Sequence, residues 1–223
     1  MPKSTRSTCR GSSVKVTGLV LAAGLSRRLG RPKQLLPYRG TTLLDHTLET
    51  ARACPFDQLL CVLGSEADAI RDSVDLRGVE VVENPGFETG CSSSIAASLG
   101  AVDPGSEVLV LMLGDQPGVP PETVAALLAA RGDAPLAASR YDDGRGHPLA
   151  FARSTFAELG ALHGDKGVWK LLDRRAADVV EVRIGGRIPI DVDTWEEYQA
   201  VLAGEEGHVN GPAHPASTGV PGP

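Results

Sequence analysis

Three aspartates have positions and spacing suited to binding a cation. Asp115 closely follows the apolar run 107–113, where a carboxylate would lose its water unless a cation faced it. Asp191 and Asp193 lie two residues apart in an extended segment, so their side chains point to one face. Carboxylates that converge on Mg²⁺, which also binds triphosphate oxygens, suit phosphoryl chemistry. The competing interpretation makes Asp115 a turn residue and Asp193 a helix cap, but it gives Asp191 no role.

The segment 16–33, VTGLVLAAGLSRRLGRPK, joins a short apolar run to a loop of small and basic residues. Small residues allow backbone N–H groups to approach phosphate oxygens closely, and Arg and Lys side chains add mobile positive charge. The loop is therefore predicted to bind a polyphosphate, with Arg27 as a solvated neighbour. The predicted nucleotide-binding residues of this loop are Leu21, Ala22, Ala23, Gly24, Ser26, Arg28 and Lys33.

Two common phosphate loops do not match this segment. A Walker A loop has four residues between its glycines and ends in Gly-Lys-Ser/Thr, whereas five residues separate Gly24 from Gly30 and Arg31 follows. A dinucleotide-binding loop reads G-x-G-x-x-G, and Ala22 stands where its first glycine would be. The segment LAAGLSRRLGRPKQLL instead resembles the signature loop of the MobA-like nucleotidyltransferases. A basic strand-to-helix loop of an unrelated α/β protein is the alternative interpretation.

Later segments resemble the same family in order along the chain. GDQP at 114–117 and DVDTWEEY at 191–198 resemble its metal-binding segments, which implies that Mg²⁺ is bound by Asp115, Asp191 and Asp193. NPGFETGCSSSIAASL at 84–99 resembles the segment that faces the nucleotide base, where Cys91 replaces an expected methionine. A serine that merely caps the following helix is the alternative there. The base and ribose candidates are Asn84, Gly90, Ser92 and Ser94.

Two segments in the second half resemble the acceptor side of molybdenum cofactor cytidylyltransferases in particular. They are GRGHPLAF at 144–151 and GDKGVWKLL at 164–172. The residue types alone favour a structural histidine in the first segment and a helix-capping aspartate in the second. The resemblance implies instead that the acceptor is bound by His147, Pro148, Asp165 and Gly167.

The expected reaction needs few catalytic groups. A phosphate monoester is already anionic near neutral pH, so catalysis reduces to alignment and charge neutralisation around the α-phosphate. The sequence accordingly shows no convincing motif for a Ser-His-Asp or Cys-His constellation. Arg28 is expected to hold the leaving pyrophosphate, Lys33 the α-phosphate and the attacking phosphate, and Asp115 the metal, and these three are the predicted catalytic residues.

The resemblance also indicates the substrates. Guanylyl-transferring relatives usually have a second glycine where this chain has Ala23, and cytidylyl-transferring relatives resemble this chain. We therefore expect CTP as donor and molybdopterin, as its molybdenum cofactor, as acceptor, with molybdoenzyme apoproteins or their chaperone as candidate protein partners. The alternatives are a guanylyltransferase acting on molybdopterin, on a phospholactate-type acceptor or on a sugar phosphate. An inactive nucleotide-binding partner protein is an alternative of another class.

Composition excludes several functions. The 223 residues carry a net charge of −6 and only 4% aromatic residues, which argues against nucleic acid as a partner. The four cysteines show no CxxC pairing, so reduced thiols and a cytoplasmic location are expected. No apolar run has the length of a membrane span, so no membrane association is expected.

Alternating apolar and amphipathic segments indicate the elements that position these residues. Strands are predicted at 16–22, 58–63, 79–82, 107–113, 135–139 and 178–184, with helices between them, an extended segment at 148–151 and a last helix from Thr194. This pattern predicts a three-layer, Rossmann-like α/β nucleotidyltransferase fold with a mostly parallel sheet, whose ligands bind at the carboxyl edge. The predicted domain spans 14–203, with disordered tails at 1–13 and 204–223.

Overall fold

The computed structural model describes residues 14–204. The predicted tails, 1–13 and 204–223, lie outside this range except for Gly204, which ends the last helix. The strands are β1 Val16–Ala22, β2 Pro37–Tyr38, β3 Thr41–Thr42, β4 Gln58–Leu63, β5 Glu80–Glu83, β6 Val108–Leu113, β7 Leu136–Tyr141, β8 Gly144–Ala152 and β9 Val179–Arg183. The helices are α1 Leu43–Ala53, α2 Ala67–Ser73, α3 Cys91–Ser98, α4 Pro121–Arg131, α5 Phe156–Gly160, α6 Gly167–Arg174 and α7 Trp195–Ala203.

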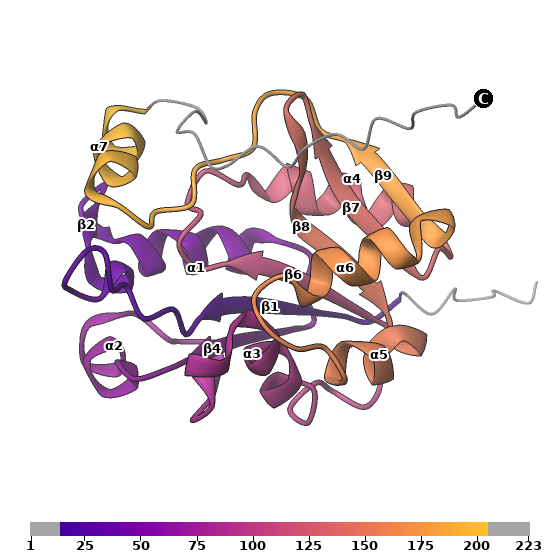
Figure 1. Ribbon diagram of the computed structural model, residues 1–223, viewed down its shortest axis with the longest axis horizontal. Helices are drawn as coiled ribbons and strands as arrows, with labels where there is room; N and C mark the ends of the chain where they lie inside the picture. The colour runs from indigo at the N-terminus through magenta and orange to yellow at the C-terminus, as the bar shows by residue number, and fades with distance from the viewer. Residues whose placement is uncertain (1–13, 205–223) are drawn as a thin grey trace, which may run out of the picture.

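Seven strands form one twisted sheet in the order β5-β4-β1-β6-β8-β7-β9 (Figure 1). Every neighbouring pair is parallel except those that β8 makes with β6 and β7, so the sheet is mixed but mostly parallel. This confirms the predicted α/β fold class. Within the described part of the chain, no helix is long and apolar enough to cross a lipid bilayer.

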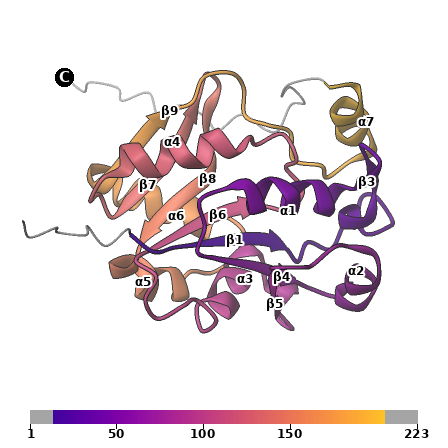
Figure 2. The same ribbon diagram turned by 180° about the vertical axis from the view of Figure 1, so that it is seen from behind.

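Helices cover both faces of the sheet, as the apolar character of its central strands requires. Residues 16–22 of β1 are buried without exception, so this strand contributes to two cores. One core contains side chains of α1, α2 and α4, and the other contains side chains of α3, α5 and α6. Figure 1 views the face with α3, α5 and α6, and Figure 2 views the face with α1 and α4. The two faces are therefore closed, and the edges of the sheet are left for ligands.

The register of the parallel strands places their carboxyl ends together. Ala22 of β1 pairs with Leu63 of β4, and Leu21 of β1 pairs with Leu113 of β6. The loops that follow β1 and β6 therefore begin side by side. These are the loops that carry the predicted phosphate-binding residues and Asp115.

The sequence analysis missed the hairpin formed by β7 and β8. It predicted a strand at 135–139 and a separate extended segment at 148–151, whereas β8 begins at Gly144 and pairs antiparallel with both β6 and β7. Gly144, Gly146 and Pro148 are residue types with low strand propensity, so the first half of β8 could not be recognised as a strand from its residues. The tight turn at 142–143 brings Arg145 and His147 onto the same sheet as the central strands.

A small third core supports the end of the domain. It contains Leu29 and Leu36 from the segment after β1, Leu43 from α1, and Val192 and Tyr198 from the α7 region. A capping box, in which Thr194 accepts from the Glu197 N–H and Glu197 accepts from the Thr194 N–H, starts α7. Thr194, and not Asp193, is thus the N-cap, which leaves the Asp193 side chain available for other contacts.

Candidate active site

A cleft of about 760 Å³ lies at the carboxyl ends of β1 and β6. It is bounded by the loop after β1, the start of α3, the GDQP turn, the β8 segment around His147, the start of α6 and segment 188–193. Most of the predicted site residues line it, namely Leu21, Ala22, Ala23, Gly24, Ser26, Arg28, Lys33, Gly90, Ser94, Asp115, His147, Asp165, Asp191 and Asp193.

The loop after β1 is folded around Ser26 and Gln34. Ser26 has a positive φ of 49°, its carbonyl accepts from Leu29 N–H, and its hydroxyl accepts from Lys33 N–H at 2.9 Å. Gln34 is buried and donates from Nε2 to the carbonyl oxygens of Ala22, at 2.7 Å, and Gly24, at 3.2 Å. These bonds fix the loop before any ligand arrives, so the basic residues that it carries are preorganised.

Lys33 lies at the centre of the charged groups in the cleft. Only 7% of its surface is exposed, and its ammonium group donates to Asp115 and, at 2.7 Å, to Asp193 Oδ1. Burial alone would lower the pKa of Lys33, but the two carboxylates outweigh burial and raise it. Lys33 is therefore charged at physiological pH, and it links the loop after β1 to both aspartate segments.

Arg28 and Gln116 complete this network. Arg28 donates to Asp193 Oδ2 at 2.7 Å. Gln116 donates from Nε2 to Asp191 Oδ1, at 2.8 Å, and to the carbonyl oxygen of Pro189, at 2.7 Å. Desolvation of its carboxylate raises the pKa of Asp191, and repulsion from the negative charge of nearby Asp115 raises it further. Three carboxylates thus share a small region with two cations.

The oxygen ligands in this region suit a hard divalent cation. Carboxylates from Asp115, Asp191 and Asp193 line one cleft, and Gln116 adds an amide whose Oε1 is buried without a hydrogen-bond partner among residues 14–204. As these side chains stand, no three of the acidic, histidine or cysteine side chains in the described chain are grouped closely enough to enclose a metal ion. The Lys33 ammonium group lies between the carboxylates of Asp115 and Asp193. The three aspartates therefore fit a divalent cation once the ammonium group moves away from one of these carboxylates.

The predicted base-binding segment mixes lining and supporting residues. Asn84 is 5% exposed and donates from Nδ2 to the hydroxyls of Ser93, at 2.8 Å, and Ser94, at 3.0 Å. Its Oδ1 accepts from Gly86 N–H, so Asn84 fixes the turn that leads into α3. Gly90 and Ser94 line the cleft, whereas Asn84 and Ser92 do not.

The start of α3 is capped by a residue far along the chain. Asp165 Oδ1 accepts from Cys91 N–H at 3.0 Å, and the Gly164 carbonyl accepts from the Ser92 hydroxyl at 2.6 Å. Gly90 has a φ of 106°, and a Cβ there would lie 2.7 Å from Asp165 Oδ1, so both conformation and space require glycine. The predicted base segment and the predicted acceptor segment are therefore joined directly, a contact that sequence reasoning did not anticipate.

Aromatic rings border the acceptor side of the cleft. The rings of His147 and Trp169 lie 5.4 Å apart, edge to face, and burial lowers the pKa of His147 to about 4, so its imidazole is neutral at pH 7. Arg145 lies in the same wall, where it is paired with Asp173 and Glu181. Pro148 and Gly167 do not line the cleft, and a Cβ on Gly167 would overlap the Ser92 hydroxyl.

Several lining residues were absent from the sequence predictions. Gln34 directly follows Lys33 of the phosphate loop, and Gln116 directly follows Asp115 in the GDQP turn. A polar side chain next to a predicted site residue is the signal that could have identified both. Trp169 and Arg145 become site residues only because α6 packs beside the β7–β8 hairpin, which no local pattern indicates. Figure 1 shows α6 in front of this part of the sheet.

Comparison with known proteins agrees with this geometry. A family model described as "MobA-like NTP transferase domain" matches residues 18–179. Nicotine blue oxidoreductase of Paenarthrobacter nicotinovorans is 32% identical over 84% of this chain and 96% of that protein. Purine catabolism protein PucB of Bacillus subtilis is 29% identical over 82% of this chain and 94% of that protein.

A solved structure extends the comparison to the metal. The crystal structure of Rv0371c from Mycobacterium tuberculosis H37Rv is 47% identical and covers 86% of this chain and 99% of that one, with a TM-score of 0.82. A complex of Rv0371c with manganese, at 44% identity, covers 85% of this chain and 99% of that one, with a TM-score of 0.78. A similar protein thus binds a divalent cation.

Proposed function

The chain belongs to the MobA-like NTP transferase family, and on that premise we propose that it is a Mg²⁺-dependent cytidylyltransferase acting on molybdopterin. It would transfer CMP from CTP to the terminal phosphate of molybdopterin, as its molybdenum cofactor, and release pyrophosphate. The bond that forms joins the acceptor phosphate oxygen to the α-phosphorus, and the bond that breaks joins this phosphorus to the oxygen of the leaving pyrophosphate. Because the acceptor oxygen is already anionic, no general base is needed.

The observation that carries this proposal is the position of Lys33. Its ammonium group bonds Asp115 and Asp193, so the predicted phosphate loop and the predicted metal ligands meet at one point. A protein that only senses nucleotides needs cations for the phosphates but has no need of carboxylates among them. Their convergence in one cleft supports transfer chemistry over simple binding.

The proposed roles follow from charge. Asp115, Asp191 and Asp193 would hold Mg²⁺, which when bound neutralises phosphate charge and orients the triphosphate. Lys33, released from a carboxylate, would contact the α-phosphate and the attacking phosphate, and Arg28 would hold the leaving pyrophosphate. In the absence of substrate, Lys33 and Arg28 each remain paired with a carboxylate, so neither positive charge is unpaired in the cleft.

The acceptor wall suits a ring system that carries a phosphate. Trp169 offers an apolar ring beside the neutral imidazole of His147. We propose that this wall contacts the fused rings of molybdopterin while its phosphate reaches toward Lys33. The names of the two curated relatives differ from each other and from this activity, so support for the acceptor comes from the residues of the cleft and from the segments GRGHPLAF and GDKGVWKLL.

The nucleotide preference rests on Ala23, which lines the cleft. Its methyl group narrows the space beside the base, which suits a pyrimidine better than a purine. Competition titration calorimetry of CTP and GTP with Mg²⁺ tests this preference. We expect CTP to bind roughly 10- to 200-fold more tightly, and Ala23→Gly to reduce the difference. Tighter GTP binding by the unmodified protein would overturn the cytidylyl assignment and favour a guanylyltransferase.

A further inference from the structure

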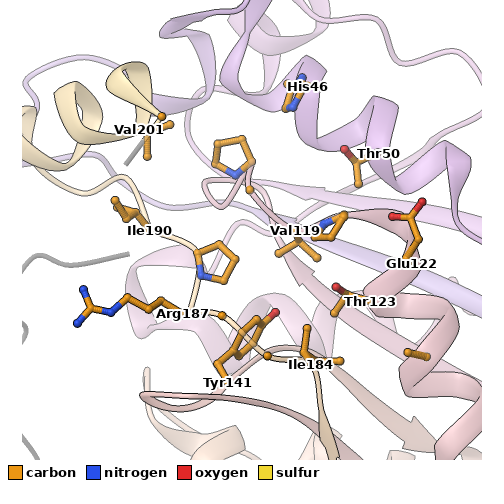
Figure 3. Close-up of a pocket in the computed structure, with 18 of the residues that line it drawn as sticks. His46, Thr50, Val119, Glu122, Thr123, Tyr141, Ile184, Arg187, Ile190 and Val201 are labelled. Carbon is orange, nitrogen blue, oxygen red and sulfur yellow. The ribbon is translucent and has the colours of Figure 1, made fainter. Parts of the chain in front are cut away.

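A second cavity, of about 720 Å³, lies outside the active-site cleft (Figure 3). Its walls are α1, with His46 and Thr50, the start of α4, with Thr123, and the segment 184–190. None of the residues assigned above to phosphate, metal, base or acceptor lines this cavity. The proposed reaction therefore leaves it without a role.

The middle of the cavity is apolar. Val119, Ile184 and Ile190 line it (Figure 3), and Pro189 and Ala126 extend this lining. Val119 is buried in the protein, and the other apolar residues are close to the surface. A volume of this size with such a lining suits the apolar body of a small organic molecule.

The charged groups around the cavity favour an anion. Among residues 14–204, the guanidinium groups of Arg39 and Arg183 line it together with one carboxylate, that of Glu122. Burial lowers the pKa of His46, and the charge of Arg39 lowers it further, so its ring adds no charge near pH 7. Within residues 14–204, Arg39 and Arg183 form no ion pair. These two groups place positive charge at the rim of the cavity on a chain whose net charge is −6.

The start of α4 contributes a side-chain hydroxyl and the partial positive charge of a helix end. Pro120 and Pro121 carry no N–H, and no side chain caps this end, which lines the cavity. Thr123 is 3% exposed, its hydroxyl makes no hydrogen bond within the described residues, and Figure 3 shows the oxygen directed into the cavity. The hydroxyl is thus open to the cavity, where a ligand or water can form a hydrogen bond with it.

We propose that this cavity is a second ligand site, which binds a small organic anion with an apolar body and alters the affinity of the active-site cleft. The anionic group, a carboxylate or a phosphate ester, would lie between Arg183 and the start of α4 and accept a hydrogen bond from Thr123. The apolar body would pack against Val119, Pro189 and Ile190.

The cavity and the cleft share two wall segments. Asp115 and Gln116 face the cleft, and Pro117 and the three residues after it face the cavity. In the second segment, Asp191 faces the cleft and Pro189 faces the cavity. Gln116 Nε2 donates to both the Pro189 carbonyl and Asp191 Oδ1, so a ligand that shifts Pro189 acts on the same amide that holds Asp191.

The test for the site uses 8-anilinonaphthalene-1-sulfonate, a fluorescent anion with an apolar body, titrated into the full chain. We expect one saturable site. Thr123→Val, which keeps the shape but removes the hydroxyl, is expected to weaken binding about fivefold. Ala126→Phe is expected to weaken it at least about tenfold, because Ala126 is exposed and lines the cavity.

Matched controls make this result specific. Ala125→Phe places the same ring on the same helix outside the cavity, and Lys170→Gln removes an exposed positive charge on α6, for comparison with Arg183→Gln. Of these two charge variants, only Arg183→Gln is expected to weaken binding of the probe. Equal binding by Ala126→Phe and the unmodified chain, or an equal loss in Ala125→Phe, would overturn the site.

The coupling rests on the proposed metal site and is tested with Mn²⁺ alone. Saturating probe is expected to change the Mn²⁺ affinity, followed by electron paramagnetic resonance of the free ion, by at least about fivefold. Saturating Mn²⁺ must change the probe affinity by the same factor, because coupling is reciprocal. Unchanged affinities would overturn the coupling. Absence of Mn²⁺ binding would refute the metal site and the coupling together, while the probe titration would still decide on the cavity.

Discussion

Lys33 is the residue on which the arrangement of the cleft depends. It bonds two aspartates that are 82 and 160 positions away in the sequence, and it does so from a nearly buried position. The sequence predicted all three residues as site residues because a phosphate loop and strand-end carboxylates have recognisable compositions. It could not predict that Lys33 pairs with both carboxylates, since a pairing between distant segments leaves no local pattern.

At this scale the first prediction concerns the metal. Asp115→Asn is expected to abolish turnover while the fold remains intact, because the amide keeps the volume of the carboxylate but binds a divalent cation weakly. Asp191→Asn is expected to be nearly as damaging. Pyrophosphate release measures turnover, and circular dichroism measures the fold. Full activity in Asp115→Asn would refute the metal assignment.

The second prediction concerns the leaving group. Arg28→Ala is expected to raise the KM for the nucleotide and to lower kcat, since charge on the leaving pyrophosphate grows in the transition state. Steady-state kinetics separates the two parameters. Arg28 is bonded to Asp193 in a partly exposed position, so little stability should be lost. A variant with reduced thermal stability and unchanged kinetics would mean that Arg28 is structural.

At the scale of elements, the apolar strands were predictable and the hairpin was not. β1 and β4 begin and end where the sequence predicted, because buried parallel strands are continuous apolar runs. β8 was recognised only in part, because Gly144, Gly146 and Pro148 lower its strand propensity and pairing with β7 overrides them. The contact between the start of α3 and Asp165 was not predicted either, because it joins segments that are 74 positions apart in the sequence.

The third prediction tests that contact. Asp165→Ala removes the acceptor for Cys91 N–H and should lower the free energy of unfolding by about 1 kcal/mol, as loss of a helix cap does. Asp165→Asn keeps an oxygen acceptor and should lose less. Urea denaturation measures both. Equal losses of activity in the two variants, with little change in stability, would indicate instead that the charge of Asp165 binds the acceptor.

At the scale of the whole molecule, charge is distributed by region. The chain is acidic overall, with a net charge of −6, yet basic side chains lie among the carboxylates of the cleft and line the second cavity. Composition predicted the acidic net charge, and the loop after β1 predicted the basic side chains of the cleft. The second region could not be predicted, because Arg39, in the turn between β2 and β3, and Arg183, at the end of β9, line one cavity only in the folded chain.

The fourth prediction concerns stability against pH. Burial lowers the pKa of His147 from 6.5 to about 4 in the folded protein. Between these values the unfolded chain binds more protons, so the free energy of unfolding falls as pH falls through this window. His147→Gln should remove roughly 1 to 3 kcal/mol of this pH dependence, measured by urea denaturation from pH 7 to pH 4. His163→Gln, at an exposed position, is the control and should leave the dependence unchanged.

Pyrophosphate release from the four nucleoside triphosphates, with Mg²⁺ and with molybdopterin or a sugar phosphate as acceptor, tests the central claim most directly. We expect release from CTP that requires both Mg²⁺ and molybdopterin and exceeds release from GTP roughly 10- to 200-fold. We expect no release with the sugar phosphate. Faster release from GTP, or no release from any nucleotide by a folded protein, would contradict the assignment of this chain as a cytidylyltransferase.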